Sequence, residues 1–358
     1  MLFSNPASAR YNCSPMKKRE KYTMKDVARL AGVSTSTVSA VLNENVPVSE
    51  DRKQRVLRAM SALHYQPDEI ARSLKKGRTR AIGVVVPDIT NAFYPEVVRG
   101  VEEAALAHGY AVFLCDSQED ATRENDHLLA LFSRRVDGVL LACCSDSNSY
   151  ETLLRLHLPC IFVDRLPASK GEGSVCTDNI QAGYQAARHL LDLGHRQIAM
   201  IVGLMSLSPH RDRLEGFRKA MQEANLPIRD EYLILGGVQI ENGFDATRQL
   251  LSLEARPSAV MVSNNKLLLG LMQALDEEKI KIPGQMSVLG FDDYAWNKYF
   301  SPSITAIAQP TFEMGRQAFG LLLNLMNHDD AVDATARHLR LPAELRERNS
   351  TAALAEIS

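Results

Sequence analysis

Short polar and small side chains gather on one face of the helix that the sequence predicts over residues 35–43. Val38, Val41 and Leu42 form the opposite, apolar face of that helix. The outward residues are Thr35, Ser36, Ser39 and Ala40. Side chains this short allow a helix to approach base edges in the major groove of DNA. The chemistry expected of this face is therefore hydrogen bonding and apolar contact to DNA bases.

Flanking helices would position this face, and the sequence marks where each helix begins. Thr23 and Asp26 have the spacing of a capping box. Gly32 suits the tight turn that follows, because glycine adopts a positive φ without strain. Ser34 is expected to cap the second helix, and Ser49 a third helix over residues 50–63. The residues expected to face the core from the first helix are Val27, Ala28 and Leu30. This pattern predicts a helix-turn-helix domain, with a small helical bundle that binds no DNA as the alternative.

The charge of the chain is divided unevenly along its length. Through Arg80 there are 16 Lys and Arg against 7 Asp and Glu, while the remainder has 25 against 36, for a formal net charge of -2. A basic end on an acidic body indicates that only the first part meets a polyanion. The alternative is an ordinary solvated run of charges.

Several classes of protein are disfavoured by what the sequence lacks. It contains no GxSxG, Walker A, HExxH or strand-linked GxGxxG motif, so we expect no enzyme. The 6 cysteines and 9 histidines lack metal-ligand spacing, so we expect no metal and no cofactor, and reduced core cysteines. The first residues have no apolar export segment, and no run of 18 apolar residues occurs. We therefore expect a cytoplasmic protein without a membrane partner.

From Ala81 onward, short apolar runs alternate with helical patterns. Such alternation predicts parallel strands joined by crossover helices. The pattern restarts after residue 174, and one sheet of this length would be unusually wide, so two doubly wound α/β lobes are expected. Open α/β sheets bind ligands at the carboxyl ends of their strands. The cleft between the lobes is therefore the expected binding site for a small molecule.

From Thr23 to about Arg348 the chain closely resembles the LacI family of bacterial transcription regulators. The motifs that carry the resemblance are "DVARLAGVS", "TVSAVLN", "YQPDEIARSLKKG", "GVVVPDITNAFYPEVVRGVE", "TDNIQAGYQAARHLLDLGHRQIAMI", "DRLEGFRKAM", "SVLGFDDY" and "AIAQP". The resemblance implies a homodimeric repressor of carbohydrate-utilisation genes that binds a pseudo-palindromic operator. Its effector would be a sugar or sugar acid bound between the lobes. A nucleoside- or purine-responsive regulator, and an architectural DNA-binding protein without an effector, remain alternatives.

The domain boundaries follow from the same resemblance. We expect a flexible N-terminal extension over 1–21, a helix-turn-helix domain over 22–66, a hinge helix and linker over 67–80, a two-lobed domain for effector binding and dimerisation over 81–348, and a tail over 349–358. Lobe 1 would comprise about 81–165 and 293–326, and lobe 2 about 166–292 and 327–348.

The resemblance also assigns residues to DNA. The positions that match DNA contacts of the family are Met24, Thr35, Ser36, Ser39, Ala40, Asn43 and, in the hinge, Leu74. A leucine in the hinge of this family wedges into the minor groove, which bends the duplex. Ala40 departs from the Arg that the family commonly has there. A bidentate contact to guanine is thereby lost, and an apolar contact to a thymine methyl becomes the expectation.

In the cleft, the resemblance assigns a second set of residues to the effector. These are Phe93, Tyr94, Asp164, Arg213, Asn264, Asp292, Trp296 and Gln309. Carboxylates accept hydrogen bonds from vicinal hydroxyl groups, and aromatic rings can stack on a sugar face. Each residue also has a structural alternative, such as Asp292 capping a loop, Arg213 pairing internally or Trp296 filling the core. Asn265 replaces the acid of the usual Asn-Asp pair, so the resemblance alone does not assign the effector of a relative to this chain.

Overall fold

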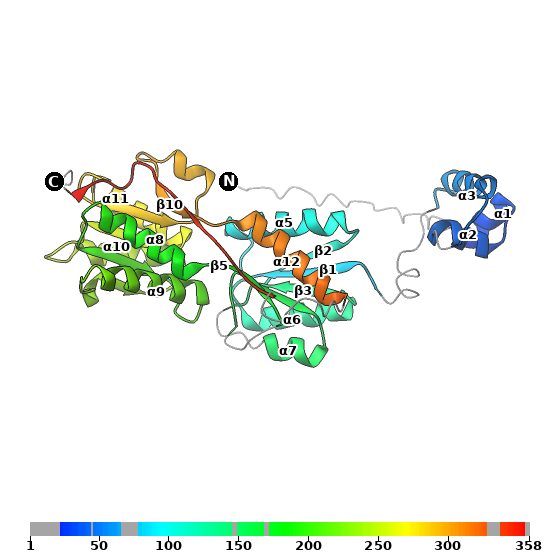
Figure 1. The fold of residues 1–358 in the computed structure, drawn as a ribbon, viewed down its shortest axis with the longest axis horizontal. Helices are drawn as coiled ribbons and strands as arrows, with labels where there is room; N and C mark the ends of the chain where they lie inside the picture. The colour runs from blue at the N-terminus through cyan, green and yellow to red at the C-terminus, as the bar shows by residue number, and fades with distance from the viewer. Residues whose placement is uncertain are drawn as a thin grey trace, which may run out of the picture. The chain divides into compact units, whose positions relative to one another are not determined.

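The computed structural model describes residues 22–43, 46–65, 78–144, 149–167, 172–327 and 337–354. The chain divides into two compact units, Met1–Gly77 and Arg78–Ser358 (Figure 1). Each unit has its own hydrophobic core. The expected extension over 1–21 lies outside the described residues, as do residues 67–77 of the expected hinge with Leu74.

The first unit consists of three helices around a small core. They are α1 (Met24–Ala31), α2 (Thr35–Asn43) and α3 (Glu50–Ala62). Val27, Ala28, Ala31 and Val38 are buried in this core. The expectation for Leu30 is wrong: it is 56% exposed, because it lies on the flank of the stripe that the other α1 residues form and Ala31 takes the core position.

The predicted helix boundaries of this unit rest on the expected caps. The Asp26 carboxylate accepts hydrogen bonds from the Thr23 backbone N–H at 2.9 Å and from the Thr23 hydroxyl at 2.7 Å. Gly32 ends α1 with a φ of 65°. Ser34 Oγ accepts a hydrogen bond from the Thr37 N–H at 3.2 Å. These caps are confirmed, whereas the Ser49 side chain makes no cap hydrogen bond within the described chain.

The second unit contains two six-stranded sheets, one in each lobe. The first sheet has β1 (Ala81–Val86), β2 (Ala111–Asp116), β3 (Gly138–Leu141), β4 (Cys160–Val163), β5 (Ser174–Thr177) and β11 (His338–Leu341). The second has β6 (Ile198–Val202), β7 (Leu233–Leu235), β8 (Ala259–Val262), β9 (Ser287–Phe291), β10 (Thr305–Ala308) and β12 (Glu344–Arg346). The strand orders are β11-β5-β4-β3-β1-β2 and β12-β10-β9-β8-β6-β7. Neighbouring strands are parallel except for β12, which pairs antiparallel with β10.

Helices cover the sheets of both lobes (Figure 1). The first lobe has α5 (Phe93–Ala107), α6 (Ala121–Ser133), α7 (Ser149–Leu156) and α12 (Thr311–Met326). The second has α8 (Asn179–Asp192), α9 (Ser208–Glu223), α10 (Ile240–Leu251) and α11 (Asn265–Glu277). The expected pair of doubly wound lobes is confirmed.

The expected boundaries between the lobes are wrong in detail. β5 pairs with β4, so the first lobe continues to Thr177 rather than ending near residue 165. β10 pairs with β9, so the second lobe continues to Ala308 rather than ending near residue 292. β11 then returns to the first sheet before β12 joins the second. The described chain thus passes between the lobes at three places, and strands of only three or four residues decide these points.

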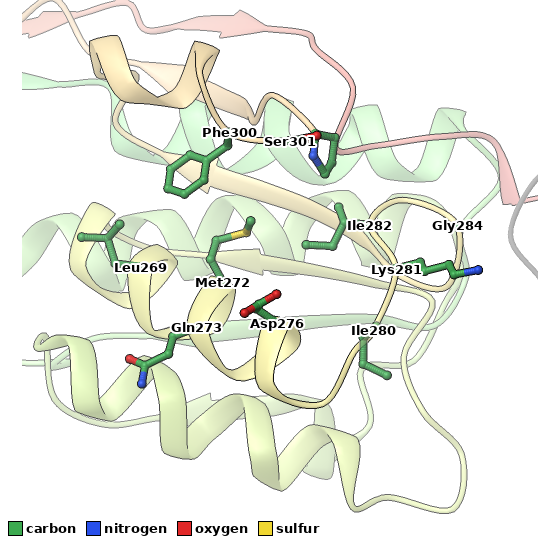
Figure 2. A pocket seen from close by; sticks show the side chains of 11 residues that line it. Leu269, Met272, Gln273, Asp276, Ile280, Lys281, Ile282, Gly284, Phe300 and Ser301 are labelled. Carbon is green, nitrogen blue, oxygen red and sulfur yellow. The ribbon is translucent and has the colours of Figure 1, made fainter.

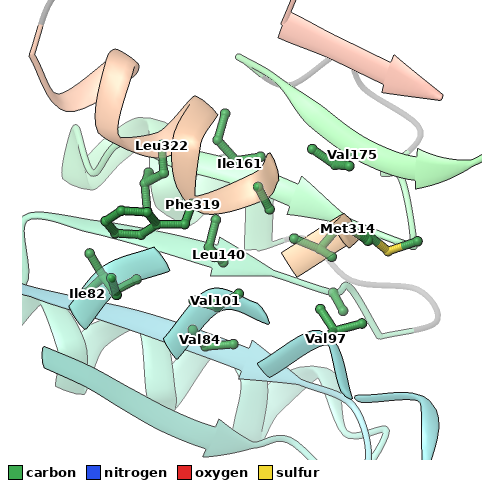
Figure 3. Close-up of a cluster of buried hydrophobic side chains, with 14 of the residues drawn as sticks. Ile82, Val84, Val97, Val101, Leu140, Ile161, Val175, Met314, Phe319 and Leu322 are labelled. Carbon is green, nitrogen blue, oxygen red and sulfur yellow. The ribbon is translucent and has the colours of Figure 1, made fainter. Parts of the chain in front are cut away.

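The core of the first lobe is formed by strands of its sheet and the two helices α5 and α12. Figure 3 shows its apolar side chains in contact across these elements. They include Ile82, Val84, Val97, Val101, Leu140, Ile161, Val175, Met314, Phe319 and Leu322. This packing holds the start of α5 against the carboxyl ends of the strands, where the expected site lies.

In the second lobe, α8 and α9 pack so closely that only glycine fits at their crossing. A Cβ atom at Gly183 would lie 2.1 Å from the carbonyl oxygen of Arg213, and one at Gly216 would lie 2.0 Å from that of Ile180. The backbones of the two helices are therefore in contact. This contact fixes α9 at the turn that carries Arg213, one of the expected effector residues.

The end of the described chain is part of the second lobe rather than a tail. The Ser350 side chain is fully buried, and its hydroxyl donates to the Val288 carbonyl oxygen at 2.6 Å. The Val288 N–H in turn donates to the Ser350 carbonyl oxygen at 2.8 Å. The expected tail over 349–358 is therefore wrong for residues 349–354, which extend the second lobe beyond the expected boundary at 348.

Candidate functional site

The expected DNA-reading face of α2 is largely accessible. Thr35 and Ser36 are exposed, while Ser39 and Ala40 are half-buried. Ser36 Oγ lies 2.7 Å from Ser34 Oγ, so the cap residue also orients the first turn of this face. Asn43 is the last residue of α2. Short side chains are thus presented along the helix, as close approach to a base edge requires.

A contact between α3 and the turn holds α2 in place. The Arg55 guanidinium donates to the Gly32 carbonyl oxygen at 3.0 Å. A Cβ atom at residue 32 would lie 2.5 Å from Arg55 Nη2, so glycine is required both for the positive φ and for this contact. Met24, expected at DNA, is half-buried and packs against the core of this unit.

In the second unit, two carboxylates lie at the carboxyl ends of strands, one from each lobe. Asp164 directly follows β4 and Asp292 directly follows β9. They are 7% and 6% exposed, and burial raises the pKa of both carboxyl groups. Their φ angles are 62° and 71°, in the left-handed region that side chains rarely adopt. Strain of this kind concentrates at binding sites, where neighbouring structure holds it.

Hydrogen bonds connect these carboxylates to three other residues. The Tyr94 hydroxyl donates to Asp164 Oδ2 at 3.2 Å. Gln309 Nε2 donates to Asp292 Oδ1 at 2.6 Å, and Gln309 Oε1 accepts a bond from the Thr177 hydroxyl at 2.6 Å. Since Thr177 ends β5 of the first lobe and Asp292 follows β9 of the second, Gln309 joins the two lobes at the site.

Arg213 supplies a buried positive charge from α9. Its Nε donates to Asn179 Oδ1 at 2.8 Å, and its Nη1 donates to the Ser263 carbonyl oxygen. The guanidinium carbon lies 4.3 Å from the centre of the Phe291 ring. Burial lowers the pKa of Arg213, and the carboxylates of Asp292 and Asp164 oppose that shift. All three charged groups therefore belong to one electrostatic cluster between the lobes.

Two neighbouring asparagines have different tasks, which the sequence could not separate. Asn264 caps α11 by accepting a hydrogen bond from the Leu267 N–H at 2.8 Å. Asn265 is 5% exposed, and its side-chain amide donates across the lobes to Asn91 Oδ1 at 2.9 Å. The structure thus supports a structural role for Asn264 and places Asn265 nearer the cleft. The "SNNK" motif was the signal, because its second asparagine departs from the pattern of the family.

The expected aromatic residues divide in a similar way. Phe93 is 4% exposed in the core of the first lobe, with its ring centre 5.1 Å from that of Tyr94. Trp296 is 39% exposed and its ring centre lies 4.6 Å from that of Tyr294. Trp296 and Tyr294 line a hollow of 460 Å³ with Asp292 and Gln309 and with first-lobe residues. The aromatic wall of this hollow is therefore formed by Trp296 and Tyr294 rather than by Phe93, and Asp164 and Arg213 lie outside its lining.

The chain was compared with known proteins. A model of the lacI family of bacterial regulatory proteins matches residues 23–68, and a model of a periplasmic binding protein-like domain matches residues 187–351. The ribose operon repressor of Escherichia coli strain K12 is 39% identical over 331 residues, which cover 92% of this chain and 99% of that relative. The chain belongs to the lacI family of bacterial regulatory proteins. It is therefore a DNA-binding transcriptional regulator and not an enzyme, as predicted.

Two solved structures of other proteins are similar to this chain. The Lac repressor dimer bound to operator and the anti-inducer ONPF is 25% identical, with a TM-score of 0.82 over 93% of this chain and 100% of that chain. A LacI family regulator from Enterococcus faecium with bound ribose is 33% identical, with a TM-score of 0.67 over 76% of this chain and 99% of that chain. The Lac repressor structure matches nearly the whole chain, whereas the Enterococcus faecium structure matches about three quarters of it.

Sequence reasoning missed Tyr294 in the site. Its hydroxyl oxygen is buried and has no hydrogen-bond partner among the described residues. Burial raises the Tyr294 pKa far above its ordinary value, with Asp292 and Tyr94 adding to the shift. A buried hydroxyl without a partner is costly, so it is available to a ligand. Its place two residues after Asp292 in "GFDDY" was the signal that could have identified it.

A second pocket lies in the second lobe, away from these residues. Figure 2 shows that it is bounded by α11 and by the segments around residues 280–284 and 300–302. Its volume is 850 Å³, and Leu269, Met272, Ile280, Ile282 and Phe300 give it a mostly apolar lining. None of the expected effector residues lines it. We also find no helix in the described part of the chain that is long and apolar enough to cross a membrane.

Proposed function

We propose that the chain is a cytoplasmic, homodimeric repressor whose operator affinity is controlled by a neutral, hydroxyl-rich sugar of about pentose size. The observation that carries this proposal is the pair of buried carboxylates, Asp164 and Asp292, at the strand ends of opposing lobes. Each has further capacity to accept hydrogen bonds beyond its contact with Tyr94 or Gln309. A polyol supplies the donors that such acceptors need.

The balance of charge favours a neutral sugar over a sugar acid. Asp164 and Asp292 face Arg213 in a site where burial raises the pKa of both carboxyl groups. A ligand carboxylate would add a third negative charge, and like charges in a buried site repel strongly. A sugar with vicinal hydroxyl groups instead donates to the carboxylates and accepts from Arg213. The sugar acid that the sequence also allowed is therefore the less favoured effector.

Two of the similar proteins favour a pentose, although others, such as that of Mannheimia succiniciproducens, are named HTH-type transcriptional repressor PurR. Of those two, one is named as a ribose operon repressor, and the other, a solved regulator of the family, holds ribose. We therefore propose D-ribose as the first effector to test. A purine or nucleoside would require an aromatic stacking site, which Phe93 in the first-lobe core does not offer but Trp296 and Tyr294 do. The binding experiment therefore includes a purine.

For the DNA, we propose a pseudo-palindromic operator read by two copies of the first unit. One α2 helix offers few base contacts, so two half-sites about one helical turn apart are needed for specificity. The proposed contacts remain Met24, Thr35, Ser36, Ser39, Ala40, Asn43 and Leu74. We further propose that residues 67–80 act as the hinge between the DNA-binding and effector-binding units.

The experiment that tests the effector measures binding of D-ribose, D-ribonate and hypoxanthine by isothermal titration calorimetry. The wild-type chain is compared with Asp292→Asn, which keeps the shape of the side chain but loses its charge. We expect D-ribose to bind the wild type and to bind Asp292→Asn at least ten times more weakly. Arg188→Gln, which removes an exposed ion pair of the second lobe, is the control and keeps its affinity. Binding of hypoxanthine but not D-ribose would overturn the sugar assignment.

A further inference from the structure

Asp164 occupies a strained turn, which the surrounding structure must stabilise. Its φ is 62°, and the Arg165 N–H donates to the Val163 carbonyl oxygen at 2.6 Å across it. A three-residue turn with a positive φ at its centre is rare and strained. Strain of this kind persists only when the surrounding structure fixes the residues beside it. The residue beside Asp164 is Arg165, which is 8% exposed.

Arg165 is anchored by a fork of hydrogen bonds. Its Nη1 and Nη2 each donate to one oxygen of the Glu119 carboxylate at 2.8 Å. Its Nη1 also lies 3.3 Å from the Cys143 carbonyl oxygen, to which it donates. Glu119 follows β2, Cys143 follows β3 and Arg165 follows β4. One guanidinium therefore ties together three loops at the carboxyl edge of the first sheet.

The same guanidinium lies beside the proposed effector site. Arg165 Nε is 4.0 Å from Asp164 Oδ2, and the guanidinium carbon is 6.0 Å from the centre of the Tyr94 ring. The fork to Glu119 fixes the direction of the guanidinium, so Arg165 acts on Asp164 through its charge and its position. The two hydrogen bonds of this single bidentate pair fix the charge and the position of the guanidinium together.

We propose that the Glu119–Arg165 pair is a positioning element for the effector, which holds Asp164 in its strained turn and in the ionised form that accepts ligand hydroxyls. This inference rests on the proposed function, because it takes Asp164 as a ligand contact. It adds two residues that neither the sequence motifs nor the effector assignments included. Arg165 is the positioning residue, and Glu119 fixes the direction of its guanidinium.

The charges around Asp164 explain why such an element is needed. The titratable groups that face Asp164 from neighbouring elements are Tyr94, Arg165, Cys176, Arg213, Asp292 and Tyr294. Burial raises the Asp164 pKa and Asp292 adds to that shift, whereas Arg165 and Arg213 lower it. Without Arg165, only Arg213 and the hydrogen bond from Tyr94 would oppose the effect of burial on the Asp164 pKa, and Arg213 also faces Asp292. Asp164 would then take up a proton at a higher pH.

The first test is the pH profile of D-ribose binding, measured by calorimetry between pH 5 and pH 8.5. We compare the wild type with Arg165→Gln, which loses the charge and the fork, and Arg165→Lys, which keeps the charge only. For Arg165→Gln we expect the fall in affinity at low pH to begin about one pH unit higher than in the wild type. Arg165→Lys should return the profile toward the wild type. The control is again Arg188→Gln, which should leave the profile unchanged.

An equal loss of affinity at every pH in Arg165→Gln would overturn the inference, because it would show a structural role alone. Asp164→Asn separates this failure from failure of the proposed function. If Asp164→Asn binds D-ribose as the wild type does, Asp164 is not a ligand contact and the proposed site is wrong. If Asp164→Asn loses binding while the Arg165→Gln profile is unshifted, only the positioning role of Arg165 fails.

The second test needs no ligand. Thermal unfolding is measured at pH 5 and pH 8 for the single variant Glu119→Gln and for the double variant Glu119→Gln, Arg165→Gln. The same pair is then measured with Asp164→Asn added to each. Because protonated Asp164 gains nothing from Arg165, removal of Arg165 should lower the melting temperature more at pH 8 than at pH 5. Asp164→Asn should abolish that difference. A difference that persists in the presence of Asp164→Asn, or that is absent throughout, would overturn the inference.

Discussion

At the scale of single residues, the ionised state of two aspartates decides whether the cleft can accept hydroxyl groups. Asp164 and Asp292 are both buried, and burial raises the pKa of each above the ordinary value of about 3.9. The form that accepts hydrogen bonds is the ionised one, so sugar binding requires a pH above these raised values. Acid should therefore weaken binding earlier than it would for exposed aspartates.

The first prediction concerns this pH dependence. The affinity for D-ribose should be constant near pH 8 and should fall as the pH decreases through the raised pKa values, by up to tenfold for each pH unit while one carboxyl group titrates. Calorimetry across this range measures the effect, with the melting temperature recorded in parallel to detect acid unfolding. Constant affinity down to pH 4 in a folded protein would show that neither carboxylate binds as the ionised form.

The second prediction compares two neighbouring residues. Asn264→Ala removes the cap of α11 and should lower the free energy of unfolding by about 1 kcal/mol. Asn265→Ala removes the contact with Asn91 across the lobes and should mainly weaken ligand binding. Chemical denaturation and calorimetry on both variants measure the two effects. The reverse result, with affinity lost in Asn264→Ala and unchanged in Asn265→Ala, would restore the original assignment of Asn264 to the effector.

The third prediction concerns the choice of bases. Ala40→Arg should shift the preferred base at one symmetric operator position toward guanine, because arginine pairs with it through two hydrogen bonds worth about 1–3 kcal/mol. Selection of operators from a random library measures the preference. Leu30→Arg is the matched control, since it adds the same charge at an exposed residue of α1. It should raise affinity for all sequences alike, and an identical effect of both changes would show that residue 40 faces no base.

At the scale of elements, close backbone contact between helices fixes the backbone positions that carry side chains of the site. α8 and α9 meet at Gly183 and Gly216, and Arg213 lies at this crossing. Two other helix pairs make the same kind of contact. These are α5 with α12 at Gly100 and Gly315, and α10 with α11 at Gly243 and Gly270. Each lobe is therefore stiffened by glycine crossings beside the elements that lead into the cleft.

The fourth prediction tests one such crossing. Gly183→Ala would place a Cβ atom 2.1 Å from the Arg213 carbonyl oxygen. Such overpacking should lower the free energy of unfolding by about 1–3 kcal/mol. It should also weaken D-ribose binding, because it moves Arg213. Gly320→Ala in α12 is the control, because nothing lies within 4 Å of its added Cβ atom. Alanine should there be neutral or stabilising. Equal stability of the two variants in denaturant would contradict the close crossing.

The sequence predicted the helices and strands better than it predicted which strands pair with each other. Helix starts such as Thr23 and Ser34 were predictable because caps are local, and strands such as β1 were predictable because they are continuous apolar runs. β5 and β11 are only four residues long, and their place in the first sheet depends on pairing with segments far away in the chain. Within the site, Asp164 and Asp292 were predictable from motifs. The role of Arg165 was not, because its contacts with Glu119 and Cys143 come from separate loops.

At the scale of the whole molecule, the two lobes are joined by polar contacts as well as by the chain itself. Lys266 Nζ of the second lobe lies 2.5 Å from Asp88 Oδ2 of the first, and both side chains are mostly buried. Hydrogen bonding to Lys266 and Thr90 lowers the Asp88 pKa although burial opposes it, so this ion pair persists at neutral pH. With Asn265 and Gln309, it makes the relative position of the lobes sensitive to what lies between them.

A ligand can change operator affinity only by as much as its affinities for the two arrangements of the lobes differ. The central claim is therefore that one site, containing Asp292, binds the sugar and controls the DNA. The test is a fluorescence-anisotropy titration of the full chain on its selected operator, with and without D-ribose, for the wild type and Asp292→Asn. We predict that D-ribose changes the operator affinity of the wild type by at least tenfold and leaves that of Asp292→Asn unchanged. The same operator affinity with and without saturating D-ribose in the wild type, or an equal response in Asp292→Asn, would contradict the account.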